Sequence, residues 1–174
     1  MSTRRFRVSF LRDRAGLLEA RREKIYSFPH RTFQEYLAAC YLTDAGFPDD
    51  LADLVRAEPN RWREVVLLAG AKAARGAASS AWTLAEALCY EDPPVQKPGQ
   101  DSEYWGALLP AQVLVENRSL GHVSNRNCPK VERIRQWMVR TLEDNALPAV
   151  DRSQSGNALA HLGDPRFRGD AWHL

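Results

Sequence analysis

The 174-residue chain has no hydrophobic run long enough to cross a membrane. Its longest apolar stretch, residues 65–71, is far short of the ~20 residues that a spanning helix needs. The first eighteen residues are interrupted by charge at every turn, which excludes a secretory signal. Cysteine is scarce, and the three cysteines are too far apart for a CxxC pair (Cys40, Cys89, Cys128). A disulfide framework or a structural zinc site is therefore not expected, and a reducing, cytoplasmic location is favoured.

The chain also lacks a large excess of charge of either sign. It holds 24 basic and 22 acidic residues. The formal net charge of +2 is too small to indicate by itself that the protein binds nucleic acid. The charge is unevenly placed, because residues 1–31 carry nine basic and three acidic residues and the remainder is net acidic. This uneven charge indicates either two functional regions or a single region that is part of a larger protein surface.

Residues for phosphate or metal chemistry are missing as well. None of the ten glycines is followed by lysine, so the phosphate loop G-x-x-x-x-G-K-[ST] is absent, and no strand ending in paired acids offers a magnesium site. The histidines are scattered without metal-binding spacing (His30, His122, His161, His173). We expect no catalytic residues, no metal and no cofactor in this chain alone, so that it is not an enzyme by itself.

What is present is ordinary globular composition, with 44% hydrophobic and 26% charged residues. Residues 16–28 predict a β-hairpin that turns near residues 22–23 and is stopped by Pro29. A helix is predicted over residues 31–44, with an apolar stripe that we expect to be core (Phe33, Leu37, Cys40, Tyr41).

The remainder predicts helices with short connections. Apolar periodicity marks helical segments near 51–57, 62–76, 80–88, 104–115, 131–142 and 152–162. Residues 91–100 hold three prolines and a glycine and predict a linker. The predicted fold class is mainly α, an N-terminal hairpin followed by an irregular helical-repeat bundle of the HEAT or armadillo kind, without a fixed repeat period.

One stretch is distinctive. Residues 25–42 read IYSFPHRTFQEYLAACYL, and eleven of them stand where a known signature expects them (Phe28, His30, Thr32, Phe33, Gln34, Glu35, Tyr36, Leu37, Ala38, Ala39, Leu42). The run closely resembles the y-x-F-x-H-x-[ST]-F-Q-E-[YF]-[LF]-A-A-x-x-L signature of NACHT-type signal-transduction NTPases, the STAND class. In that family the motif lies in the winged-helix domain after the ATPase core, so the resemblance implies a partial winged helix here.

The same resemblance implies a cofactor-binding role for His30. In the family this histidine reaches a phosphate of bound ADP in the closed, inactive form, and exchange of ADP for ATP permits oligomerisation. An imidazole N–H suits this contact with a polyanion. ADP or ATP would thus be bound by the intact parent protein, with the ATPase core present. The residues alone leave open that His30 only caps the following helix.

A second resemblance lies at the end of the chain. Residues 151–166 contain ALAHLGDPR and resemble a segment that closes the helical region of many bacterial NACHT proteins, often before a formylglycine-generating-enzyme-like domain. We expect neither that domain nor the ATPase core in this chain. The predicted organisation is a partial winged helix, a helical region, a linker, a second helical region and a tail (1–46, 47–92, 93–102, 103–163, 164–174).

The function expected from these features is that of a non-catalytic part of a NACHT signalling ATPase, a nucleotide-state sensor and helical scaffold, with bacterial antiviral defence as one setting. Its partner would be the NACHT ATPase core, in cis or in trans. One alternative is a winged-helix DNA binder, but the helix at 31–44 offers only Arg31 as a basic residue, so nucleic acid is not expected. Another is a stand-alone interaction scaffold anchored by tryptophans, each of which is more simply core.

Overall fold

An antiparallel hairpin opens the part of the chain that the computed structural model describes, residues 16–23, 25–94 and 99–167. Strand β1 (Glu19–Arg22) pairs with β2 (Ile25–Ser27), with Glu19 opposite Ser27 and an irregular register near the turn. Helix α2 (Arg31–Asp44) follows directly, with the bounds predicted from the sequence. The hairpin and the helices after it confirm the predicted mainly α fold class.

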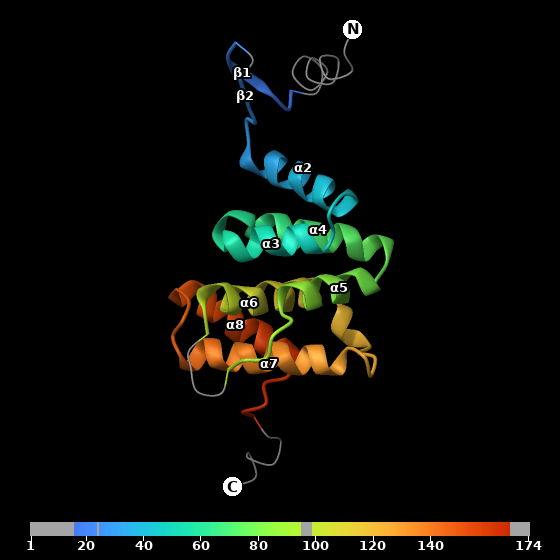
Figure 1. Ribbon diagram of the computed structural model, residues 1–174, viewed down its shortest axis with the longest axis vertical. Helices are drawn as coiled ribbons and strands as arrows, with labels where there is room; N and C mark the ends of the chain where they lie inside the picture. The colour runs from blue at the N-terminus through green and yellow to red at the C-terminus, as the bar shows by residue number, and fades with distance from the viewer. Residues whose placement is uncertain (1–15, 24, 95–98, 168–174) are drawn as a thin grey trace.

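Six further α-helices and one short 3-10 helix complete the described part. They form successive layers, with α2 above α3 and α4, then α5 and α6, then α7 and α8, so the hairpin lies at one end of an elongated stack (Figure 1). Each layer contacts the next, as the layers of irregular helical repeats do. The elements are α3 (Asp49–Ala57), α4 (Pro59–Gly76), α5 (Ser79–Leu88), α6 (Asp101–Glu116), η1 (Ser119–Gly121), α7 (Cys128–Glu143) and α8 (Ala149–Leu162).

Proline, glycine and capping residues explain several helix ends. Pro59 begins α4, where a missing N–H costs nothing, and Gly163, at φ +89°, follows the last residue of α8. The side chains of Gln100 and Glu103 form a capping box that starts α6. Pro110 lies inside α6, which continues through it, and is buried.

The core extends across the helical layers. Its largest fully buried side chains include Trp137 of α7, Tyr104 of α6 and Leu51 of α3. Helices α4 and α6 approach closely at Gly70, because a Cβ there would lie 2.8 Å from Cγ1 of Val113. The tryptophans predicted to be core are buried at three positions (Trp82, Trp105, Trp137); Trp62 is half-buried, and Trp172 lies outside the described residues.

The predicted core stripe of α2 is wrong at Phe33 and Tyr41. Phe33 is 39% exposed and Tyr41 70% exposed, whereas the buried residues of this helix are Ala39 and Leu42. Leu37 and Cys40 are half-buried. The smaller residues face α4, where they allow the two helices to approach, and the aromatic residues lie on the other side. Both faces show helical periodicity, so the pattern alone did not distinguish them.

Among the described residues, none of the helices has the length and apolar character needed to cross a bilayer.

Candidate functional site

His30 lies at the junction between the hairpin and α2. It occupies the N-cap position in extended conformation, and its carbonyl oxygen accepts a hydrogen bond from the Phe33 N–H at 3.2 Å. Its imidazole does not cap the helix and forms no hydrogen bond with the described residues. The ring instead lies against Phe33, with centroids 5.8 Å apart. The exposed imidazole nitrogens are therefore available to a ligand.

The hairpin and α2 together carry large exposed hydrophobic side chains, which we call the exposed apolar set. Its members are more than one third exposed (Ile25 55%, Tyr26 37%, Phe33 39%, Tyr36 56%, Tyr41 70%). Elsewhere in the described residues only three others reach this exposure (Tyr90, Val150, Phe167). Exposed apolar residues gathered in this way mark interaction surfaces, and sequence reasoning missed this surface because it assigned two of its members to the core.

Helix α4 holds the C-terminal part of α2. The Lys72 ammonium of α4 lies 2.6 Å from Oδ1 of Asp44 and donates to the carbonyl oxygen of Cys40 at 3.1 Å. The hydrogen bond with Asp44 raises the pKa of Lys72 above its ordinary value. Because Cys40 and Asp44 are in the last turns of α2, this contact fixes the C-terminal end of the helix on the stack.

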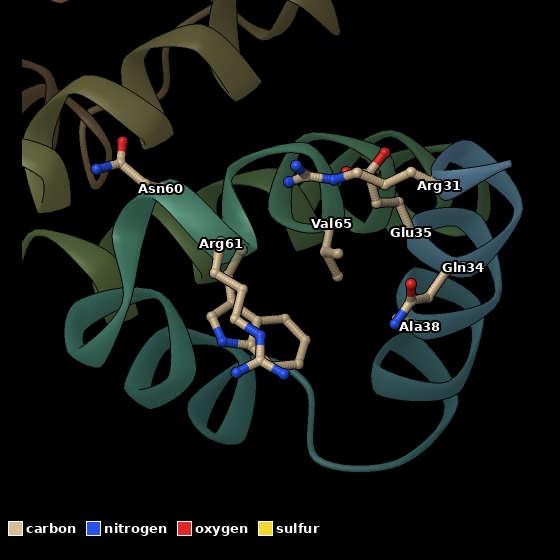
Figure 2. A pocket seen from close by; sticks show the side chains of 8 residues that line it. Arg31, Gln34, Glu35, Ala38, Asn60, Arg61 and Val65 are labelled. Atoms are coloured by element: carbon tan, nitrogen blue, oxygen red, sulfur yellow. The ribbon is translucent and has the colours of Figure 1, made fainter. Parts of the chain in front are cut away.

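A cleft of about 450 Å³ separates the N-terminal half of α2 from the start of α4 (Figure 2). Arg31, Gln34, Glu35 and Ala38 line it from α2, and the α4 wall comprises a second set (Asn60, Arg61, Trp62, Val65). The Arg31 Nε–H donates to Oε1 of Glu35 at 2.6 Å.

On the α4 side, the Arg61 guanidinium lies 5.6 Å from the Trp62 ring centroid. Both guanidinium groups of the cleft are already paired with carboxylates, Arg31 with Glu35 and Arg61 with Glu58. No spacing rule predicted this cleft, since its walls come from helices that are separated in the sequence.

His30 does not line this cleft, although the next residue, Arg31, does. The start of α2 thus presents two separate features, an exposed imidazole and a cleft toward α4. Within residues 16–23, 25–94 and 99–167, no group of three or more His, Cys, Asp or Glu side chains could hold a metal ion. All three cysteines are free thiols.

Most of the basic residues in the net basic segment 1–31 lie outside the described residues. Six of its nine basic residues fall there (Arg4, Arg5, Arg7, Arg12, Arg14, Lys24). On α2 itself Arg31 is paired with Glu35, so the described part of this helix presents no unpaired arginine or lysine on its first turn.

Comparison with protein families finds a similarity in the N-terminal region of the chain. Residues 4–42 match a family model described as the winged helix-turn-helix domain C-terminal to NACHT. The match includes the hairpin and His30 and ends inside α2 at Leu42. Residues 4–42 are therefore similar to a NACHT-associated winged-helix domain, which confirms the resemblance seen in residues 25–42. No curated protein and no solved structure matches the chain.

Proposed function

We propose that this chain is a non-catalytic part of a NACHT signalling ATPase, in which the winged-helix segment senses the nucleotide state and the helical stack serves as an interaction scaffold. The observation that carries the proposal is the family match over residues 4–42, which contains His30. A NACHT ATPase core, in cis or in trans, is the partner. Signal transduction is the process, with bacterial antiviral defence as one setting.

The environment of His30 supports the sensor role. Its imidazole is exposed and makes no hydrogen bond within the described part of the chain, so no internal hydrogen bond must break before it can meet a phosphate oxygen. At the start of α2 the backbone carbonyl oxygen of His30, and not its side chain, accepts a hydrogen bond from the helix. In the proposed closed state the imidazole donates a hydrogen bond to a phosphate of ADP, and replacement by ATP releases this contact.

The exposed apolar set supports the partner assignment. It lies on the same segment as His30, on β2 and on exposed positions of α2. A core docked there would remove Tyr36 and Tyr41 from water and bring its nucleotide near His30. Apolar burial would supply affinity, while the histidine would make that affinity depend on the nucleotide.

The test uses the parent protein containing its ATPase core. His30→Ala should weaken ADP retention and raise ligand-free oligomerisation by about ten-fold, because a hydrogen bond to a charged group contributes roughly 1.5–3 kcal/mol. His161→Ala, which removes an exposed histidine from α8, is the matched control and should change neither.

The isolated chain provides the second half of the test. There His30→Ala should leave the melting temperature nearly unchanged, since the imidazole has no internal hydrogen bond to lose. A large loss of stability in the isolated chain, together with unaltered oligomerisation of the parent, would show that His30 has only a structural role.

A further inference from the structure

A second cleft, of about 330 Å³, lies away from the winged-helix segment, where the end of α4, the start of α5 and the turn after α6 meet. Its polar and aromatic walls include Ser79 and Trp82 of α5 and residues 117–119 with His122 from the segment after α6. Both titratable side chains in this lining, Arg118 and His122, are bases, and no carboxylate lines the cleft.

Arg118 is an exposed residue of the cleft lining. Its backbone is left-handed, at φ 52° and ψ 29°, and is anchored by a hydrogen bond from its N–H to the Val115 carbonyl oxygen at 3.1 Å. Its guanidinium forms neither an ion pair nor a hydrogen bond with the described residues. By contrast, Arg133 and Arg140 of α7 are paired with Asp92 and Asp144.

The other donors in the cleft are also unused. The hydroxyls of Ser79 and Ser119 and the His122 imidazole make no hydrogen bond within the described part of the chain. The Asn117 amide differs, because its Nδ2 donates to the Val113 carbonyl oxygen at 2.8 Å. The cleft therefore gathers a guanidinium, an imidazole and two hydroxyls in a lining that contains no carboxylate to balance the positive charge.

We propose that this cleft binds the phosphate group of a small phosphate ester. A phosphate monoester has three terminal oxygens and a charge near −2, so it can accept from several walls at once. A carboxylate offers only two oxygens and one charge, and would leave some of these donors unmatched. The volume admits the phosphate together with a small organic group.

The test is a titration of the full 174-residue chain with inorganic phosphate and with glycerol 3-phosphate, followed by NMR at the backbone amides of residues 79, 80 and 119. Both ligands should produce saturable shifts at these amides. Sodium chloride at matched ionic strength, and acetate, should produce weak shifts that do not saturate. Equal responses to acetate and to phosphate would overturn the assignment to phosphate.

Two substitutions separate binding from folding. Arg118→Gln should weaken phosphate binding at least about ten-fold, whereas Arg126→Gln, which removes the same charge outside the cleft, should not. Ser79→Asp should abolish binding by placing a carboxylate in the cleft. It should not lower the melting temperature, because acidic residues favour the first turn of a helix. Unchanged binding in both Arg118→Gln and Ser79→Asp would exclude the site.

Discussion

The indole Nε1–H of Trp137 donates a hydrogen bond to the carbonyl oxygen of Glu91 at 2.8 Å. Trp137, in α7, is 1% exposed, and its ring also meets Tyr104 of α6 edge-on, with centroids 5.4 Å apart. One side chain thus connects α6, α7 and the segment that leaves α5. This contact holds residues after α5 against the stack just before the proline-rich stretch.

Trp137→Phe should lower the free energy of unfolding by about 1–3 kcal/mol, because it removes this hydrogen bond and part of a buried ring. Urea denaturation measures the change. Trp82→Phe is the matched control, since Trp82 is also buried but its indole forms no hydrogen bond with the described residues. A loss no greater for Trp137 than for Trp82 would show that the bond to Glu91 contributes nothing.

The carboxylate of Asp144 should make the free energy of unfolding depend on pH in the acidic range. Its Oδ2 accepts from the Tyr104 hydroxyl at 2.7 Å and from the Arg140 Nε–H at 3.1 Å, and the Tyr104 bond is the main cause that lowers the pKa of Asp144. A lowered pKa stabilises the fold above the ordinary aspartate pKa of about 3.9. This contribution is lost as the pH falls through the lowered pKa.

Asp144→Asn should therefore flatten the fall in unfolding free energy between about pH 4 and pH 2, as measured by urea denaturation at several pH values. Asp53→Asn, at an exposed aspartate of α3, should leave that profile close to wild type. If Asp144→Asn keeps the full acid dependence, the Tyr104 contact is not its origin.

The ion pair between Lys72 and Asp44 should control how firmly α2 is held on α4. Lys72→Met should increase amide hydrogen exchange in the last turns of α2, because it removes the donor to Asp44 and to the Cys40 carbonyl oxygen. Arg75→Met, one turn further along α4, should not. Exchange that rises equally throughout the chain would instead indicate a global loss of stability.

The three thiols should react in an order that follows burial. Burial raises the pKa of Cys89 to about 12, so almost no thiolate forms near neutral pH. Cys128 is exposed and Cys40 is half-buried. With a disulfide reagent at pH 8, Cys128 should react first, Cys40 more slowly, and Cys89 only after unfolding. Cys128→Ser should remove the fast phase, and a fast phase that persists in this variant would contradict the order.

Much of the local structure was determined by the sequence itself. The bounds of α2, the start of α4 at Pro59 and the end of α8 before Gly163 follow from proline and glycine, whose backbone preferences act over a few residues. The buried face of α5 followed from periodicity, because its other side is largely polar. The winged-helix resemblance was equally local, since it rests on a contiguous run of residues.

Only the tertiary structure decided which face of α2 is covered. Both Phe33 with Tyr41 and Ala39 with Leu42 recur at helical spacing, and the choice depends on α4, which lies some twenty residues later. The cleft around Arg118 arises in the same way, from helices whose residues are about forty positions apart. Local patterns report how a helix turns, whereas burial, pairing and clefts depend on which elements meet, and that is set by packing between distant segments.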